Sequence, residues 1–539
     1  MDDPSIRTLD EPASAIGVAD AGPPDAERPQ GQRERGSHTS LIADHVRGSS
    51  LMLAGRLAAL VVAFLTQVII VRHLSTGDYG AFAYALSAVL LLQSVLPLGM
   101  DRSDTRFLAW YDERRDPGRL LGVIVLEAGT VLLLGGVAIA GALALRGSLE
   151  SSLTSNERAF DVLLALLALA PLQALDTLVI NVFAVFAKPW SVFFRRYVLD
   201  PGLRLLVAVA LVATNGGVLF LAVGYVCSGL LGVAIYSVLL IRLLARLGFL
   251  GGASLRSLVL PVRDVFAFSV PLLLTNVVAV ASTELAAVVL GHYHPSASVA
   301  AFRAVEPVAA LNLVVIYSFT TLFTPAAARL YARGDREGLR RLYWQSACWV
   351  AVLTFPVLCV TTALADPVTV AAFGDRYSGS ALYLALLSAG YYVNAALGFN
   401  GITVLMLGRL RYLTIGNLGV LAWMVGIDLL LIPPWGATGA AVAVLASVLV
   451  HNAVKQAGLG FGGGIGIFDR KHAAVLLQLM LVLAALIVVM LATRPPLAVG
   501  LVVVAFVTLV LLRLIGPALD LRAMFPELAR TRVLRWIVR

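Results

Sequence analysis

Eight polar residues stand inside otherwise apolar stretches of the chain: Arg56, Gln67, Tyr84, Arg204, Asn276, Glu284, Arg303 and Glu306. Several follow helical spacing. Arg56 and Gln67 are eleven residues apart, and Arg303 and Glu306 are three apart, so each pair lies on one helical face. A guanidinium can bind a phosphate group, and polar stripes of this kind are what a water-filled crevice requires.

Each of these residues also has a purely structural interpretation, and both interpretations stay open at this point. Arg303 and Glu306 could neutralise each other. Arg56 and Arg204 lie close enough to helix ends to extend their guanidinium groups into the interface. Other polar residues in apolar runs are predicted to make interhelical hydrogen bonds: Asp176, Asn394, Asn400 and Asp428.

Composition indicates the elements that carry these residues. The 539-residue chain is 59% hydrophobic and 14% charged, with a mean hydropathy of +0.88, which excludes a water-soluble domain. Segments of about 20 apolar residues, enough to cross a bilayer as a helix, recur along it. We predict an all-α polytopic membrane protein with fourteen spans: 50–71, 80–100, 120–145, 161–187, 197–213, 218–241, 265–290, 298–324, 342–365, 379–406, 412–432, 437–454, 473–492 and 496–516.

The distribution of Lys and Arg orients these spans. With the N-terminus inside, the inner loops hold 22 of these residues and the outer loops hold 5, as cytoplasmic retention of positive charge requires. Both termini are therefore predicted to be cytoplasmic. The segment "RHLSTGDYG" (72–80) becomes an outer turn, in which Gly77 and Asp78 suit a tight reversal.

Weak internal similarity predicts two repeated halves. Segments 75–82, 106–122 and 216–228 resemble 295–302, 329–344 and 435–447, at nearly one offset. We predict a disordered cytoplasmic tail (1–47), a six-helix N-lobe (48–245), a six-helix C-lobe (246–460), and two further helices with a basic tail (461–539). The lobes would be related by a pseudo-twofold axis, with the substrate between them.

Several classes of function are not expected. The arginines are dispersed over many loops, so we expect no nucleic-acid partner. His292, His294 and His451 have no acidic or thiol cluster nearby, so no metal site is predicted. We predict no cofactor, although the membrane potential, H⁺ or Na⁺ could drive the protein. An enzyme is not expected because no sizeable outer loop or sugar-nucleotide motif is present.

The motifs resemble a known family. "RHLSTGDYGAFAYA", "RLYARGDREGLRRLY", "FGDRYSGSALYLALLSAG", "GRLRYLTIGN" and "IPPWGATGAA" are similar, in order, to motifs of the polysaccharide and lipid-linked oligosaccharide flippases. These belong to the multidrug/oligosaccharidyl-lipid/polysaccharide exporter superfamily. The resemblance covers roughly residues 48 to 460 and implies a V-shaped pair of lobes that open alternately to the two sides.

The resemblance implies a cargo and a role. The cargo would be an oligosaccharide on a polyprenyl (di)phosphate, flipped from the inner to the outer leaflet of the cytoplasmic membrane while its tail stays among membrane lipids. Polysaccharide polymerases and glycosyltransferases would be partners. The lipid II branch carries several cavity arginines, and here only Arg56 and Arg303 occupy comparable positions, which favours a capsule or exopolysaccharide precursor. A lipid II flippase and a cation-coupled multidrug exporter, using Glu127, Glu284, Glu306 or Asp428, are the alternatives.

Overall fold

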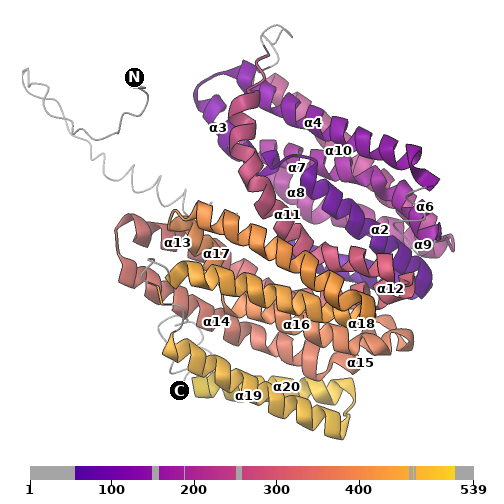
Figure 1. The fold of residues 1–539 in the computed structure, drawn as a ribbon, viewed down its shortest axis with the longest axis vertical. Helices are drawn as coiled ribbons and strands as arrows, with labels where there is room; N and C mark the ends of the chain where they lie inside the picture. Colours follow the sequence, from indigo (N-terminus) through magenta and orange to yellow (C-terminus); the bar gives the residue numbers. More distant parts are fainter. Residues whose placement is uncertain are drawn as a thin grey trace, which may run out of the picture. The chain divides into compact units, whose positions relative to one another are not determined.

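The computed structural model describes residues 55–147, 157–186, 189–249, 258–460, 465–466 and 469–515, all within the compact unit Leu53–Arg539. The predicted N-terminal tail and the end of the basic tail lie outside the described residues. The described chain is almost wholly helical, in the order shown in Figure 1. We call the two ends of the bundle inner and outer, after the orientation that the sequence predicts.

We call the helices between Gly55 and Arg246 the N-lobe, after the predicted first half. They are an unnumbered first helix (Gly55–His73), α2 (Thr76–Val95), η1 (Met100–Arg102), α3 (Asp104–Glu113), α4 (Pro117–Ala144), α6 (Glu157–Leu167), α7 (Leu169–Val185), α8 (Pro189–Phe194), the π-helical turn η2 (Arg195–Leu199), α9 (Asp200–Ala213) and α10 (Val218–Arg246). Helix α3 falls in a stretch that the sequence predicts as an inner loop. Its face with Phe107, Leu108 and Tyr111 is buried, which explains why it is ordered as a helix.

We call the helices from α11 to α18 the C-lobe, after the predicted second half. Its elements are α11 (Val262–Tyr293), α12 (Ser296–Ala309), η3 (Ala310–Leu313), α13 (Val314–Ala332), α14 (Arg336–Ala363), α15 (Ala365–Phe373), η4 (Asp375–Ser380), α16 (Ala381–Ala396), α17 (Asn400–Met406) and α18 (Leu410–Gly460). Helix α18 holds two of the predicted spans, separated by a kink. Pro433 and Pro434 precede Gly436, whose φ of 54° lies outside the helical region and favours glycine.

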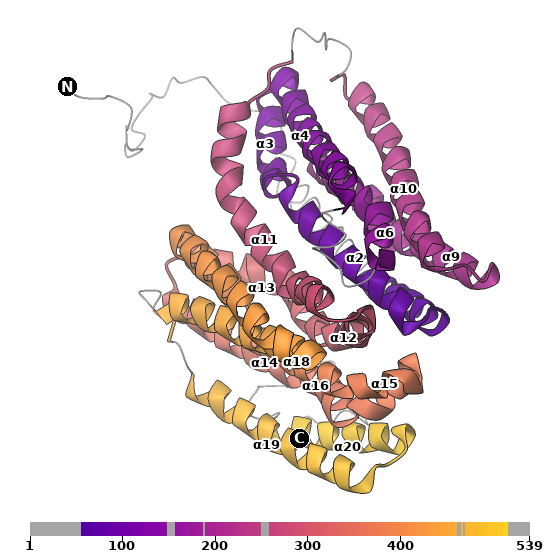
Figure 2. The ribbon, with the colours of Figure 1, turned by 45° about the vertical axis from the view of Figure 1, so that its right-hand side comes forward.

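The predicted number of spans agrees with this arrangement. Twelve described helices are long and apolar enough to cross a membrane. One of them, α18, is two helices joined at Gly436, and the continuous segment 189–213 provides another. The last pair, α19 (Arg470–Thr493) and α20 (Leu497–Ile515), packs on α14 through apolar residues, and Figure 2 shows it beside the C-lobe, on the side away from the N-lobe.

The outer turn differs in detail from the prediction. Ser75 caps α2: its Oγ accepts a hydrogen bond from the Asp78 amide at 3.0 Å and donates to Asp78 Oδ2 at 2.8 Å. Gly77 and Asp78 therefore lie in the first turn of α2, and the reversal itself falls at His73–Ser75. The prediction that these two residues form the turn is wrong because the Ser75 cap starts the helix earlier.

Interhelical hydrogen bonds were predicted for four polar residues, and three of these residues make such bonds in the structure. Asp176 accepts from Arg195 Nε at 2.7 Å. Asn452 joins two others, donating to Asn394 at 3.1 Å and accepting from Asn400 at 3.0 Å. These contacts hold helices together within each lobe. For Asp428, 3% exposed, the structure gives no such partner among the described residues.

Candidate functional site

A polar cavity lies between the N-lobe and α11, the first helix of the C-lobe. Its volume is about 430 Å³, and its walls come from α2, η1, α7, η2 and α11. Asn276 joins the two sides, because its Nδ2 donates to the Ser94 carbonyl at 3.2 Å and its Oδ1 accepts from Arg102 Nη2 at 2.9 Å. We call this space the inter-lobe cavity.

The lining of the inter-lobe cavity includes two arginines and two acidic residues, Asp101 and Glu284. Arg102 and Arg196 both line it, and 54% of the Arg102 side chain is exposed even though it pairs with Asp101 at 3.7 Å. Both arginines fall in stretches that the sequence predicts as inner loops. Leu98 and Gly99, which have φ of 50° and 82°, turn the chain after α2 so that Arg102 returns to the cavity.

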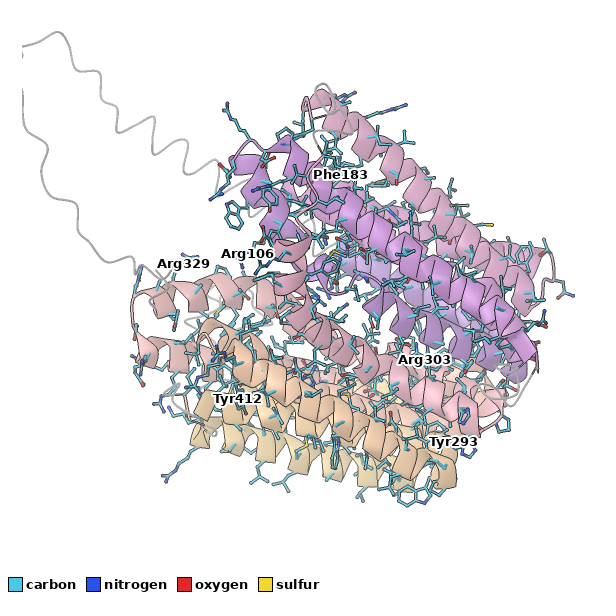
Figure 3. All side chains as sticks on the ribbon, turned by 45° about the horizontal axis from the view of Figure 1, so that its top comes forward. Arg106, Phe183, Tyr293, Arg303, Arg329 and Tyr412 are labelled. Carbon is cyan, nitrogen blue, oxygen red and sulfur yellow. The ribbon has the colours of Figure 1, made fainter. Side chains whose placement is uncertain are left out.

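A charged cluster lies at the outer side of the same cavity. Arg303 pairs with Glu284 at 3.0 Å and with Glu306, and its Nη1 donates to the Thr283 carbonyl at 3.1 Å. Between 9% and 14% of each charged side chain is exposed. Glu284 and Thr283 also line the cavity. Figure 3 shows Arg303 toward the Tyr293 end of the bundle, away from Arg329.

Residues of three more helices interact with this charged cluster, directly or through a neighbour. Tyr391 donates to Glu306 at 3.3 Å. Gln67 donates to the Tyr79 hydroxyl, and Tyr79 lies near enough to Arg303 to interact electrostatically. The structure thus brings together Gln67, Glu284, Arg303 and Glu306 from the predicted site. Arg303 already has two carboxylate partners, so any anion must compete with them.

The remaining predicted site residues lie apart from this cluster. Arg56 stacks on the Tyr317 ring, 4.2 Å from its centroid. Tyr84 is 3% exposed and is packed where a side chain at Gly291 would touch its ring. Asn276 is on the cavity wall, beside Arg102. Arg204 lies within the N-lobe and pairs with Asp200 at 3.2 Å.

The outer end of the structure is closed by contacts between the lobes. Arg72 donates to the carbonyls of Ala371 and Ala372 at 2.6 and 2.9 Å, and Arg376 donates to the Val71 carbonyl. We call these contacts the outer latch. Nearby, α2 and α12 approach so closely that a Cβ at Gly80 would lie 1.7 Å from the Ser296 carbonyl oxygen.

Two carboxyl groups are buried at the inner side of the N-lobe. Asp104 and Glu127 are both 0% exposed, and Asn181, a cavity residue, donates to Asp104 Oδ2 at 3.1 Å. Burial raises the pKa of Asp104 to about 6, although its hydrogen bonds with Glu127 and Asn181 act in the opposite direction. Among the described residues, no group of three or more His, Cys, Asp or Glu side chains could hold a metal ion.

Comparison with known proteins identifies the family to which this chain belongs. A family model described as polysaccharide biosynthesis protein matches residues 45–331. The chain belongs to this family. No curated protein sequence matches significantly. The family match confirms the resemblance read from the motifs.

Solved structures share the fold of this polysaccharide biosynthesis family member. The lipid II flippase MurJ in an inward closed conformation is 12% identical, with a TM-score of 0.64, over 89% of this chain and 99% of that chain. An inward-facing multidrug resistance MATE family transporter of the MOP superfamily is 18% identical, with a TM-score of 0.57, over 79% of this chain and 95% of that chain. The outward-facing form of a multidrug resistance MATE family transporter of the MOP superfamily is 18% identical, with a TM-score of 0.51, over 82% of this chain and 95% of that chain. At these identities the similarity establishes the fold alone.

Proposed function

We propose that the protein flips a polyprenyl-(di)phosphate-linked oligosaccharide from the inner to the outer leaflet of the cytoplasmic membrane by alternating access. Capsule or exopolysaccharide synthesis would use the product. The observation that carries this proposal is a polar, arginine-bearing cavity between two lobes whose outer ends are latched together. Family membership in polysaccharide biosynthesis supports the choice of cargo.

Arg102 and Arg196 would bind the phosphate groups. Moving a charged headgroup through hydrocarbon is costly because charges and hydroxyls lose their water. Two guanidinium groups in a polar cavity replace that water with charge-assisted hydrogen bonds. Arg102 has one Nη donor on Asn276 and a largely exposed side chain, so it can bind an anion without first losing a buried partner.

Arg56 and Arg303 would act before and after this step. Arg56, near the inner end of the first helix, would engage the phosphate first. Arg303, on the outer side of the cavity, would bind it once the lobes rock. For Arg303 this requires exchange, since a phosphate must displace Glu284 or Glu306. We infer that this exchange loosens the charged cluster beneath the outer latch and so favours outward opening.

The membrane potential can supply the driving force. Moving one charge across 100 mV is worth about 2.3 kcal/mol, so a diphosphate with about two negative charges gains roughly 4 to 5 kcal/mol when it moves outward. Transport of this kind needs no ATP. Glycosyltransferases that build the cargo and a polymerase that consumes it are the expected partners.

A liposome assay tests the proposal. The purified protein would be reconstituted with a fluorescent polyprenyl diphosphate oligosaccharide, and its appearance in the opposite leaflet would be followed under an imposed potential. Arg102→Ala and Arg196→Ala should each slow flipping at least about tenfold, since each removes a charge-assisted hydrogen bond. Arg119→Ala, which removes an exposed arginine paired with Asp116, should not. Flipping that is unaffected by both cavity variants would reject the proposed site, and potential-independent efflux of cationic drugs would favour the multidrug exporter.

A further inference from the structure

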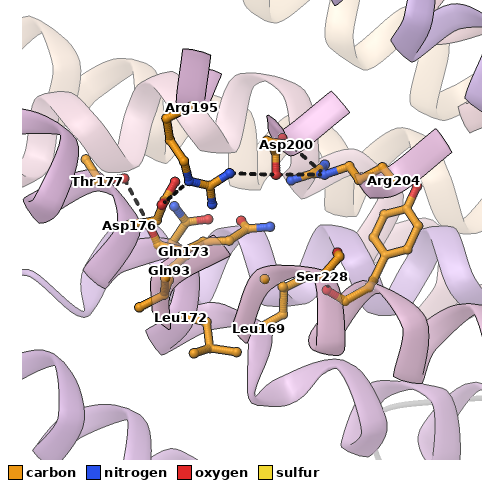
Figure 4. Close-up of a pocket in the computed structure, with 13 residues that line it drawn as sticks. Gln93, Leu169, Leu172, Gln173, Asp176, Thr177, Arg195, Asp200, Arg204 and Ser228 are labelled. Atoms are coloured by element: carbon orange, nitrogen blue, oxygen red, sulfur yellow. Dashed lines mark hydrogen bonds and ion pairs between the residues drawn. The ribbon is translucent and has the colours of Figure 1, made fainter. Parts of the chain in front are cut away.

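A second polar pocket lies wholly within the N-lobe, beside the inter-lobe cavity. Its volume is about 170 Å³, and α2, α7, η2, α9 and α10 form its walls (Figure 4). We call it the N-lobe pocket. Its hydrogen-bonding side chains include Gln93, Gln173 and Ser228. A pocket of this size and polarity fits one small hydroxylated group rather than a large apolar molecule.

The charges of the N-lobe pocket cancel within it. Arg195 Nε lies 2.7 Å from Asp176 Oδ1, and Arg204 Nε lies 3.2 Å from Asp200 Oδ2. Each arginine of this pocket is thus paired with an aspartate, so the pocket does not favour a phosphate or a cationic drug. Paired carboxylates and guanidinium groups still present free lone pairs and N–H groups, which suit the hydroxyl groups of a neutral ligand.

One donor in the pocket is left without a hydrogen bond. Arg195 is 2% exposed, and its Nη1 is buried with no hydrogen-bond partner among the described residues. It lies 3.9 Å from Asp200 Oδ1, which is an ion pair but too long for a hydrogen bond. In contrast, 37% of the Asp200 side chain is exposed. A hydroxyl group placed here could accept from Arg195 and donate to Asp200.

The pocket adjoins the phosphate site through two consecutive residues. Arg195 lines the N-lobe pocket and Arg196 lines the inter-lobe cavity. Both stand in the π-helical turn η2, a geometry common at functional sites. Gln93 and Thr177 line both spaces. The two spaces are therefore neighbours, and a group attached directly to a phosphate on Arg196 would lie beside the N-lobe pocket.

We propose that the N-lobe pocket binds the sugar that is directly linked to the phosphate of the cargo. This inference rests on the proposed function and assigns its selectivity for the first sugar to the N-lobe pocket, next to the arginines that bind the phosphates. Arg102 and Arg196 hold the phosphates, while Asp200, Arg195 and Gln173 hydrogen-bond the sugar hydroxyls. Lipid phosphates without a sugar bind less tightly because they leave this pocket empty.

Equilibrium binding to the purified full-length protein tests the inference. Three probes are compared: undecaprenyl diphosphate, and the same lipid carrying one glucose or one galactose. At least one sugar-bearing probe should bind about tenfold more tightly than the bare diphosphate, as expected for two or three added hydrogen bonds. Gln173→Leu, and separately Ser228→Leu, which fills the pocket, should reduce this preference to about one and leave affinity for the bare diphosphate unchanged.

The outcomes separate this inference from the function on which it rests. Arg196→Ala should weaken all three probes, because it acts on the phosphate. If wild type binds the bare and sugar-bearing lipids equally, and Arg196→Ala weakens both, the sugar pocket is overturned while the phosphate site stands. If no probe binds wild type, both fail. If Gln173→Leu and Ser228→Leu both unfold at the wild-type temperature and keep the preference, the pocket assignment is overturned.

Discussion

Arg72 and Arg376 hold the outer ends of opposite lobes, each by hydrogen bonds to the other lobe's backbone. Arg72 extends from the first helix to the Ala371 and Ala372 carbonyls, and Arg376 extends from η4 back to the Val71 carbonyl. Each arginine lies next to the segment that its counterpart contacts. In the outer latch the acceptors are therefore backbone carbonyls, which any residue would provide. Only the two arginine donors depend on the side chain present.

Breaking the outer latch should shift the protein toward an outward-open state. Arg72→Ala removes two charge-assisted hydrogen bonds, and about 1.5 to 3 kcal/mol for each would change the population by at least tenfold. Electron-spin distances between labels at Thr214 and Ser378, both exposed at the outer end, should lengthen. Arg146→Ala, which breaks an exposed pair with Asp161 in the same lobe, is the control. An unchanged distance distribution would show that the latch does not hold this state.

Gly80 offers a separate test of the same closure. A methyl group at Gly80 would meet the Ser296 carbonyl oxygen at 1.7 Å, so Gly80→Ala must push α2 and α12 apart. We expect it to lengthen the same outer distances and to lower the unfolding temperature. A Cβ added at Gly129 would have no atom within 4 Å. Gly129→Ala should therefore be neutral or stabilising, because alanine is about 1 kcal/mol more favourable than glycine in a helix. Equal behaviour of the two variants would count against close contact at Gly80.

Substitutions in the charged cluster should have non-additive effects on stability. Arg303→Met leaves Glu284 and Glu306 without their cation in a largely buried place, which should cost about 3 to 5 kcal/mol. The triple variant R303M/E284Q/E306Q removes the unpaired charges and should recover most of the unfolding temperature. It should still not flip substrate, since no cation remains to receive the phosphate. Thermal unfolding and the liposome assay together check this, and recovery of flipping in the triple variant would exclude a phosphate role for Arg303.

Asp104 predicts how stability depends on pH. Burial raises the pKa of Asp104 to about 6 from its ordinary value of 3.8. The fold therefore favours the protonated acid, and its contribution to stability is fully present below about pH 4 and decreases as pH rises through 6. Between pH 5 and 7.5 this group alone should reduce the free energy of unfolding by about 1 kcal/mol.

Asp104→Asn is the corresponding variant, because asparagine cannot ionise. Its unfolding temperature should exceed that of wild type at pH 7.5, and the difference should shrink at pH 5. Thermal unfolding across this pH range measures it. Asp161→Asn, an exposed aspartate in the same lobe, should show no such trend. A gap that grows on acidification would mean that Asp104 is held ionised.

The sequence predicted the architecture because the length and apolarity of a span are local properties. The spans follow from these properties, whereas the two repeated lobes stay a prediction from weak internal similarity at a nearly constant offset. The pair Arg303 and Glu306 was visible from its spacing of three. Glu284 as the second carboxylate on Arg303 was not, because that contact depends on the relative register of α11 and α12.

The arginines of the cavity were missed for a different reason. Hydropathy assigned Arg102 and Arg196 to inner loops, since both flank apolar segments. Their positions depend on local backbone features that residue types do not reveal: the left-handed Leu98 and Gly99, and the π-helical turn η2. A charged residue immediately next to a predicted span boundary, such as Arg196 before the span 197–213, was the one available signal.

The π-helical turn has a consequence for how this chain should be compared with its relatives. A π turn holds one residue more than the α-helical turn it replaces, so deleting a single amino acid within Arg195–Leu199 would rotate everything before it by about 100° relative to α9. One of the two arginines would then leave its compartment. Family members with a one-residue alignment gap at this point should handle a different first sugar, and the gap can be recognised without solving their structures.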